Sequence, residues 1–254
     1  MAEWNDPRTT GVSPTATVGV PRAARDAGLR SYMLSVYNYM ASGVLLTGIV
    51  AMLVMNSPLI RLVVNPATGQ PTLLPIIALF ASLGVGVWLQ RGIVGMSIGT
   101  AKTLFFGYAA LLGLAFSTIF LAYTGVSIAQ TFFAVAAAFC SLSLWGYTTK
   151  RDLSGWGSFL MMGVVGIFVA LLLNVGLAIF TGHASPALDL GISAIGVLIF
   201  AGLTAYDTQV IKNIYFAVGT GQLAVKTAIL GAFRLYLDFI NMFLFLLRFM
   251  GNRR

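Results

Sequence analysis

Acidic side chains, cysteine and histidine are all scarce in this sequence of 254 residues. Asp and Glu together number 7, with one Cys and one His. Cys140 therefore has no partner for an intramolecular disulfide, and with His183 far away in the sequence we expect no zinc site. The sequence also lacks a P-loop, a Ser/His/Asp arrangement and a cluster of metal ligands, so we predict that the protein is not an enzyme and needs no cofactor.

Charge of either sign is rare as well. Charged residues make up 9% of the chain, whereas soluble domains hold about 25%. A hydrophobic fraction of 58% and a mean hydropathy of +0.91 predict an integral membrane protein whose first partner is the lipid bilayer. The net charge is +8, but the basic residues lie between hydrophobic runs or at the chain ends. This pattern indicates topology signals, and no nucleic acid is expected as a partner.

Seven apolar runs meet or approach the roughly 20 residues that a membrane-spanning helix needs. They are Met33–Met55, Leu73–Gln90, Thr103–Tyr123, Ile128–Tyr147, Trp156–Phe180, Leu188–Tyr206 and Thr227–Met250. The strict alternation of a β-barrel is absent, and helices satisfy their own backbone hydrogen bonds in lipid. The predicted fold class is all-α, a bundle of seven transmembrane helices.

The chain is expected to divide into residues 1–29, a disordered cytoplasmic tail, and residues 30–254, the membrane domain. The tail is rich in Pro, Thr and Arg and has no apolar core of a signal peptide. Most Lys and Arg of the loops fall on one side if the N-terminus is cytoplasmic, and only Arg61 lies in an outer loop. Seven crossings place Arg253 and Arg254 outside, which contradicts the rule that Lys and Arg collect on the cytoplasmic side. The last helix either crosses fully or re-enters, and its length favours a full crossing.

The last apolar run carries a polar stripe. Steps of three, four, three and seven place five residues on one helix face: Gly231, Arg234, Asp238, Asn241 and Arg248. Such a stripe should turn toward protein, so we predict that this C-terminal helix is central in the bundle. Arg234 and Asp238 are four residues apart and can pair within the helix. One interpretation of that pair is a purely structural buried ion pair.

The sixth run repeats this theme with Thr204, Asp207 and Thr208 on one face, and its periodicity predicts that the helix continues to Ala217. Asp207 and Asp238 should then meet at one depth. A carboxylate at the centre of a membrane helix costs about 2.5–3.5 kcal/mol, so it is expected to have a partner and a function. Two such carboxyls in contact would share one proton and act as a pH sensor. The alternative is two unrelated acids, each with its own Arg or Thr.

At these residues the chain resembles the Bax inhibitor-1 family of membrane proteins, including its bacterial YccA and YetJ branches. The segment Leu235-Tyr-Leu-Asp-Phe-Ile-Asn241 is similar to the most specific family signature, and Ala205-Tyr-Asp-Thr-Gln-Val-Ile-Lys212 is similar to the motif of the sixth helix. Lys150-Arg-Asp-Leu-Ser154 resembles the loop into the fifth helix. The resemblance runs from about Leu29 to Gly251.

The resemblance implies a seven-helix bundle with the last helix in the middle. In calcium-leak members of the family, the acids of the sixth and seventh helices share a proton, and an Arg that ends the second helix latches onto them. Asp207 and Asp238 match the acids, and Arg91 matches the latch by position, although it also fits a loop charge that sets topology. Calcium-leak relatives carry a Glu on the second helix where this chain has Phe80. Calcium binding is therefore expected to be weak and transient.

Two functions are expected from these residues. The first is a pH-sensitive cation leak, with calcium and protons as ligands, Asp207 and Asp238 as sensor and ion path, Arg91 or Arg234 as latch, and Asn241 and Thr204 as polar lining. The second is a non-enzymatic regulator that binds a protein partner, such as a membrane protease complex in bacteria. An intramembrane aspartyl protease is disfavoured, because Leu235-Tyr-Leu-Asp238 replaces the Gly-x-Gly-Asp of such enzymes. The expected location is a bacterial inner membrane.

Overall fold

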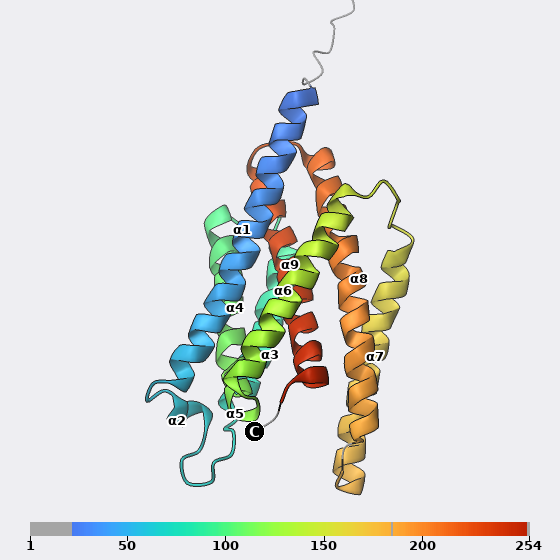
Figure 1. Ribbon diagram of the computed structural model, residues 1–254. Helices are drawn as coiled ribbons and strands as arrows, with labels where there is room; N and C mark the ends of the chain where they lie inside the picture. Colours follow the sequence, from blue (N-terminus) through green and yellow to red (C-terminus); the bar gives the residue numbers. More distant parts are fainter. Residues whose placement is uncertain (1–21, 184, 253–254) are drawn as a thin grey trace, which may run out of the picture.

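The structure, a computed structural model, describes residues 22–183 and 185–252 as a bundle of helices (Figure 1). The helices are α1 (Arg22–Met55), α2 (Ile60–Val63), α3 (Leu74–Gly92), α4 (Ile98–Phe116), α5 (Ile119–Ala122), α6 (Gly125–Thr148), α7 (Trp156–Thr181), α8 (Pro186–Val218) and α9 (Gln222–Met250). Seven stretches are long and apolar enough to cross a membrane, α4 and α5 together forming one of them. The predicted all-α class and the seven spans are confirmed.

The first helix begins earlier than expected. α1 starts at Arg22, so residues 22–29 are helical and Leu29 is buried, whereas the sequence predicted a disordered tail up to residue 29. Hydropathy marks only the part of a helix that lies in lipid, and the Ala, Arg and Leu residues around position 25 are good helix formers in water. The rest of the predicted tail, residues 1–21, lies outside the described residues.

The connection between α1 and α3, which lies between two predicted spans, has local structure of its own. It contains the short helix α2 and an isolated antiparallel bridge between Val64 and Pro71. Gly69 turns the chain with a φ of +67°, a conformation that glycine adopts without steric cost. The loop therefore folds back on itself at the end of the bundle near α5 (Figure 1).

Polar residues fix where several helices begin. The side chains of Ser97, Thr124 and Ser185 accept hydrogen bonds from backbone N–H groups in the first turns of α4, α6 and α8. Such caps satisfy donors that a helix start leaves without a partner. At the other end, α7 stops at Gly182, whose φ of +77° closes the helix in the left-handed region.

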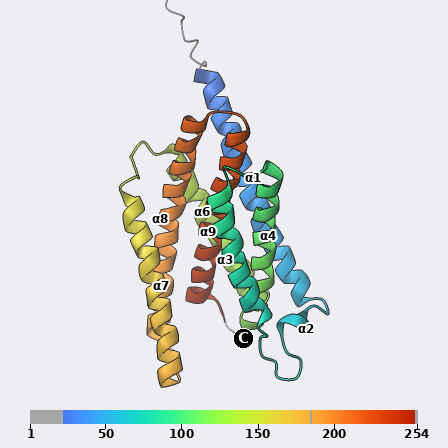
Figure 2. The same cartoon turned by 180° about the vertical axis from the view of Figure 1, so that it is seen from behind.

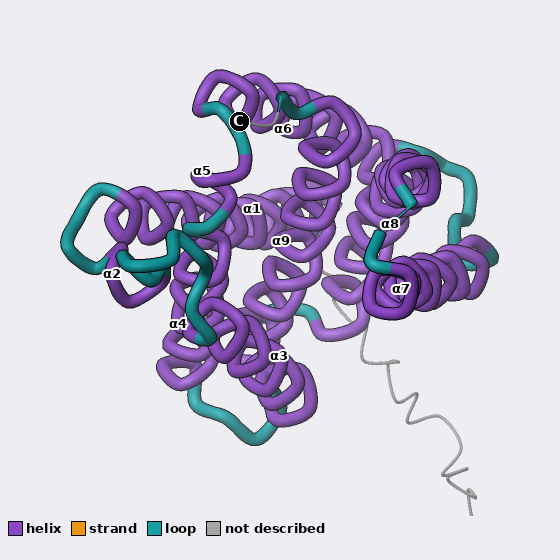
Figure 3. The backbone as a smooth tube through the Cα atoms, turned by 90° about the horizontal axis from the view of Figure 1, so that it is seen from below, coloured by secondary structure: helices purple, strands orange, loops and turns teal. Residues whose placement is uncertain are grey.

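The C-terminal helix α9 packs against α1, α4, α6 and α8. Viewed along the bundle, it lies among these helices (Figure 3). A larger share of α9 is buried inside the protein than of any other membrane span. In contrast, α7 packs chiefly against α8, at one side of the bundle in both lateral views (Figures 1 and 2).

Small residues allow the helices around α8 to approach closely. A Cβ atom at Gly146 of α6 would lie 2.9 Å from the backbone Cα of Ala205, and one at Gly196 would meet the ring of Phe245 in α9. A Cβ at Gly231 would lie 3.1 Å from Ile211. Close backbone approach at small residues is a common way to pack helices in membranes. Here it fixes the position of α8 against both α6 and α9.

The inner face of α9 is anchored to α1 by a hydroxyl pair. Tyr236 is fully buried, and its hydroxyl lies 2.7 Å from Thr47 Oγ1, which also lies 2.9 Å from the carbonyl oxygen of Ala109 in α4. This cluster joins three helices at one level. It leaves no polar atom of the Tyr236 side chain without a partner.

Thr47→Val is expected to lower the free energy of unfolding by about 1–3 kcal/mol, because the buried Tyr236 hydroxyl loses its partner while the side-chain shape is kept. Denaturant or thermal unfolding of the purified protein measures the change. Ser42→Ala is the control, since Ser42 is exposed and its hydroxyl bonds only to Asn38 of its own helix. Equal effects of the two substitutions would contradict the role of this cluster.

Candidate functional site

The contacts of the small residues give the register between α8 and α9, which run antiparallel. Gly231 faces Ile211 and Gly196 faces Phe245, so Asp207 lies level with Arg234 and Leu235. Asp238 lies about three residues further along α9, or roughly 4.5 Å at 1.5 Å per residue. The two acids thus lie on neighbouring helices, and their backbone positions are offset by about one turn. This offset arises because α9 starts at Gln222, five residues before the expected Thr227. The sharing of a proton by the two carboxyls stays a prediction.

Asp238 is the most enclosed acid of the described chain. It is 4% exposed, and its Oδ2 atom is the one buried side-chain oxygen or nitrogen in the described residues without a hydrogen-bond partner. Asp207 and Arg234 both lie close enough to act on it electrostatically. Arg234 also acts on Asp207. One cation and two carboxyls therefore form a compact group, which we call the acid cluster.

Direct bonds within the acid cluster are absent from residues 22–183 and 185–252. The structure shows neither an ion pair within 4.0 Å between Arg234 and either acid nor a hydrogen bond between Asp207 and Asp238. The predicted pairing of Arg234 with Asp238 inside the helix is thus not formed here. The three groups interact across a gap, which leaves the carboxyl oxygens open to a proton or a cation.

A chain of hydroxyl groups leads away from this level of α8. Thr204 is fully buried and donates to the carbonyl oxygen of Phe200, and Thr208 donates to the carbonyl oxygen of Thr204. The Thr208 hydroxyl lies 2.9 Å from Ser143 in α6, which lies 2.7 Å from the Tyr37 hydroxyl in α1. The sequence singled out Thr204 and Thr208 but gave no signal for Ser143 or Tyr37, because each is one of several uncharged polar residues in its apolar run.

Arg91 is not brought to the acid cluster. It lies exposed in the last turn of α3, and the structure shows no ion pair from it within the described chain. Phe80, on the same helix, is 66% exposed and does not point into the core. Helix α3 therefore supplies neither a cation nor an acid to the cluster, and the latch role of Arg91 stays a prediction.

Asn241 faces a different part of the bundle. Its side-chain amide donates to the carbonyl oxygen of Leu237 in its own helix, and the residue lines a cavity of about 630 Å³. Tyr108, Leu112 and Arg248 line the same cavity. Neither acid contributes to its wall, so Asn241 adds no oxygen to the acid cluster in this conformation. Its predicted place in the polar lining of the ion path stays a prediction.

Gln209, two residues from Asp207, holds the loop between α6 and α7. Its side-chain oxygen accepts from the backbone N–H of Leu153 at 2.8 Å, and its nitrogen donates to the carbonyl oxygen of Arg151 at 2.8 Å. Within the loop, the backbone N–H and the hydroxyl of Ser154 bond to Asp152 and lower the pKa of that carboxyl. We call this arrangement the Gln209 clasp. It ties a surface loop to the helix that carries Asp207.

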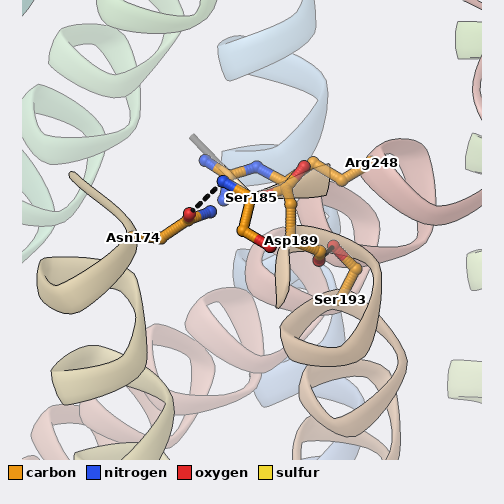
Figure 4. Close-up of polar contacts among 5 residues, drawn as sticks. All are labelled: Asn174, Ser185, Asp189, Ser193 and Arg248. Carbon is orange, nitrogen blue, oxygen red and sulfur yellow. Dashed lines mark hydrogen bonds and ion pairs between the residues drawn. The ribbon is translucent and has the colours of Figure 1, made fainter. Parts of the chain in front are cut away.

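A second polar group lies at the opposite end of α8 and was missed in the sequence. Asn174 is buried in α7 and accepts from the backbone N–H of Ser185 at 2.9 Å (Figure 4). Asp189 lies 4.0 Å from Arg248 of α9, and Ser193 donates to the carbonyl oxygen of Asp189. A single Asn within the apolar stretch Trp156–Phe180 was the signal that could have found this group. It ties α7 and α9 to the start of α8.

Metal binding by clustered side chains has little support in the structure. The described residues contain no group of three or more His, Cys, Asp or Glu that could hold a metal ion. The acid cluster offers two carboxylates, whereas Ca²⁺ takes six to eight oxygen ligands. Weak, transient calcium binding stays a prediction.

Comparison with known proteins identifies the family. The family model described as inhibitor of apoptosis-promoting Bax1 matches residues 29–254. The chain belongs to the Bax inhibitor-1 family. Among similar proteins of this family, the inner membrane protein YbhL of Escherichia coli is 45% identical over 230 residues, which cover 90% of this chain and 94% of YbhL. The protein RP147 of Rickettsia prowazekii is 44% identical over 230 residues, covering 90% and 92% of the two chains.

Another bacterial relative matches this chain over a similar length. A protein of Caulobacter vibrioides is 42% identical over 234 residues, which cover 90% of this chain and 91% of the relative. The resemblance inferred from the motifs of the sixth and seventh helices is therefore confirmed. The protein is a membrane protein of the Bax inhibitor-1 family with seven helices of membrane-spanning length.

Proposed function

We propose that this Bax inhibitor-1 family protein is a pH-sensitive cation leak, in which the acid cluster of Asp207, Asp238 and Arg234 is the sensor and calcium is the principal ion. The observation that carries the proposal is the enclosed carboxyl of Asp238, whose Oδ2 has no partner while a second acid and one Arg act on it. A buried polar atom without a partner inside a membrane helix is costly. A function that needs a carboxyl oxygen without a fixed partner would explain why this costly arrangement is kept.

The charge of the acid cluster gives the mechanism. Two ionised carboxyls and one guanidinium carry a net charge of −1, and one bound proton makes the cluster neutral. A neutral group is tolerated far better in a low-dielectric core than an uncompensated charge. When the proton leaves, the excess negative charge attracts a cation or pushes the helices apart. Flux should therefore rise as the pH rises.

The cation would pass without a permanent cage of ligands. Asp207 is partly exposed, whereas Asp238 is enclosed one turn further along, so an ion meets the two acids one after the other. Thr204 and the backbone carbonyls around it supply further oxygens at the level of Asp238. Such a sparse site binds weakly, and weak binding allows an ion to leave. Calcium is favoured over monovalent ions because a divalent charge interacts more strongly with the pair.

We also propose that the protein lies in a bacterial inner membrane with its N-terminus in the cytoplasm. The inner membrane protein YbhL supports the location, and the excess of Lys and Arg in alternate loops supports the orientation. The hairpin between α8 and α9 and the Gln209 clasp then lie on the cytoplasmic side. The sensor responds to cytoplasmic pH in this arrangement, because Asp207 is the acid nearer to that side.

Calcium entry into liposomes that contain the purified protein tests the proposal. We expect flux to rise by up to about tenfold per pH unit between about pH 6 and about pH 8, since loss of a single proton controls it. Asp207→Asn and Asp238→Asn should each flatten the profile. Asp152→Asn, which removes an exposed acid of the clasp loop, is the matched control and should keep the wild-type slope. An unchanged slope in both cluster variants would refute the sensor.

The second candidate is a regulator that binds a protein partner, and the family's description as inhibitor of apoptosis-promoting Bax1 favours a regulatory role for the family. A protein without measurable calcium flux that co-purifies with another membrane protein would support this function instead. Deletion of residues 1–21 and substitution in the 149–155 loop would then show which surface the partner contacts.

A further inference from the structure

A long groove separates α1 from α6 on the outer surface of the bundle. The cavity in this groove has a volume of about 980 Å³, and Phe239 of α9 lies at its base. The two helices flank α9 (Figure 3), and within the wall of the groove they meet through the hydrogen bond between the Tyr37 and Ser143 hydroxyls. This groove lies apart from the acid cluster, since neither Asp207 nor Asp238 contributes to its wall.

The wall of the groove is almost entirely apolar. Met33, Met40 and Phe139 line it as buried residues, while Leu45 and Leu144 at its rim are 64% and 63% exposed. Flexible methionine side chains adapt to an irregular apolar ligand. An open apolar groove of this kind in a membrane span faces the hydrocarbon of the bilayer.

One end of the groove is charged. Asp26 and Arg30 of α1 lie there, four residues apart on one helix, and Tyr147 of α6 lines the same end. Although their spacing permits an ion pair, none is formed, and no hydrogen bond engages either charged side chain in the described part of the chain. Lys212 places its ammonium group 5.2 Å from the ring centre of Tyr147. The end of the groove therefore offers one free carboxylate and one free guanidinium side by side.

We propose that this groove binds one phospholipid, with an acyl chain along α1 and α6 and a zwitterionic headgroup at Asp26 and Arg30. The guanidinium of Arg30 binds the phosphate, and the carboxylate of Asp26 binds a primary ammonium, as in phosphatidylethanolamine. Bidentate pairing of a guanidinium with phosphate is among the stronger polar contacts in proteins. The proposal does not depend on the cation leak.

The charge of the groove favours a phospholipid over an apolar helix of a partner protein. From Arg30 to Leu45 the wall is about 22 Å long at 1.5 Å per residue, which is long enough for an extended acyl chain. At one end, Asp26 and Arg30 offer both signs of charge that a zwitterionic headgroup needs, whereas an apolar transmembrane helix has no group for either.

The single cysteine of the chain provides the test. Cys140 is exposed and lines the groove seven residues, or about 10 Å, from Tyr147 at its charged end. A small bimane fluorophore on Cys140 is titrated in detergent micelles with phosphatidylethanolamine that carries bromine in the middle of its acyl chain. The control carries Leu172→Cys with Cys140→Ala, since Leu172 is 56% exposed on α7 and outside the groove.

We expect saturable quenching at Cys140, with half-saturation at about tenfold less brominated lipid than at the control site. The double variant Asp26→Asn with Arg30→Gln should lose most of this difference, and phosphatidylglycerol should bind the wild type more weakly. Native mass spectrometry of the unlabelled protein should show one retained lipid, which Ala136→Trp removes by filling the groove. Equal, non-saturating quenching at both sites would overturn the proposal. So would a cysteine crosslink from Cys140 to another polypeptide, which would assign the groove to a protein helix.

Discussion

Arg234→Gln should destabilise the protein by up to about 3 kcal/mol, less than breaking a buried ion pair in direct contact usually costs, because two acids then remain in the core without the cation that acts on them. The loss should be larger at about pH 8 than at about pH 6, since protonation of the acids removes the uncompensated charge. Adding Asp238→Asn to Arg234→Gln should restore most of the stability. Unfolding of the four proteins in a double-mutant cycle measures the interaction directly.

Arg248→Gln is the matched control for this experiment. Arg248 lies on the same helix, but its side chain is 42% exposed and lies 4.0 Å from Asp189, so its loss should cost less than about 1 kcal/mol. Arg234→Lys keeps the positive charge and should retain most of the stability. If Arg234→Gln is as stable as the wild type at both pH values, Arg234 does not balance the two acids.

Gly146→Ala is expected to destabilise the protein by about 1–3 kcal/mol or to prevent its folding. The new Cβ atom would lie 2.9 Å from the backbone Cα and carbonyl carbon of Ala205, and a backbone cannot move aside as a flexible side chain can. Helices α6 and α8 would have to separate at a point two residues from Asp207. A lower melting temperature of the purified protein, by about 5 °C or more, would show the effect.

Alanine in place of another helical glycine should have the opposite effect on the melting temperature. A Cβ at Gly107 of α4 meets nothing within 4 Å, and alanine favours a helix over glycine by about 1 kcal/mol. Gly107→Ala should therefore leave the melting temperature unchanged or raise it. If both variants melt like the wild type, the close crossing of α6 and α8 is not needed for stability.

The sequence predicted the helices well because they depend on local pattern. Apolar runs of membrane length defined the seven spans, and the polar stripe of Arg234 and Asp238 stood out against an apolar helix. The continuation of the sixth span past Asp207, expected to Ala217, is confirmed by α8, which ends at Val218. In each case the information lay within about 20 neighbouring residues.

Features that depend on packing between helices could not be predicted from the sequence. The offset of about one turn between Asp207 and Asp238 follows from contacts such as Gly231 with Ile211, which no single helix encodes. The tie between Asp189 and Arg248 joins residues nearly 60 positions apart, and each looks like an ordinary charge at a helix end. The groove beside Cys140 depends on how α1 and α6 are spaced around α9, and neither helix encodes that spacing alone.

The two hydrogen bonds from Gln209 couple the segment after α6 to helix α8. Since Gln209 follows Asp207 by two residues, a slide or rotation of α8 at that acid has to drag residues 151–153 with it or break both bonds. A shift of α8 at Asp207 would therefore also change the position of residues 151–153, outside the membrane-spanning helices.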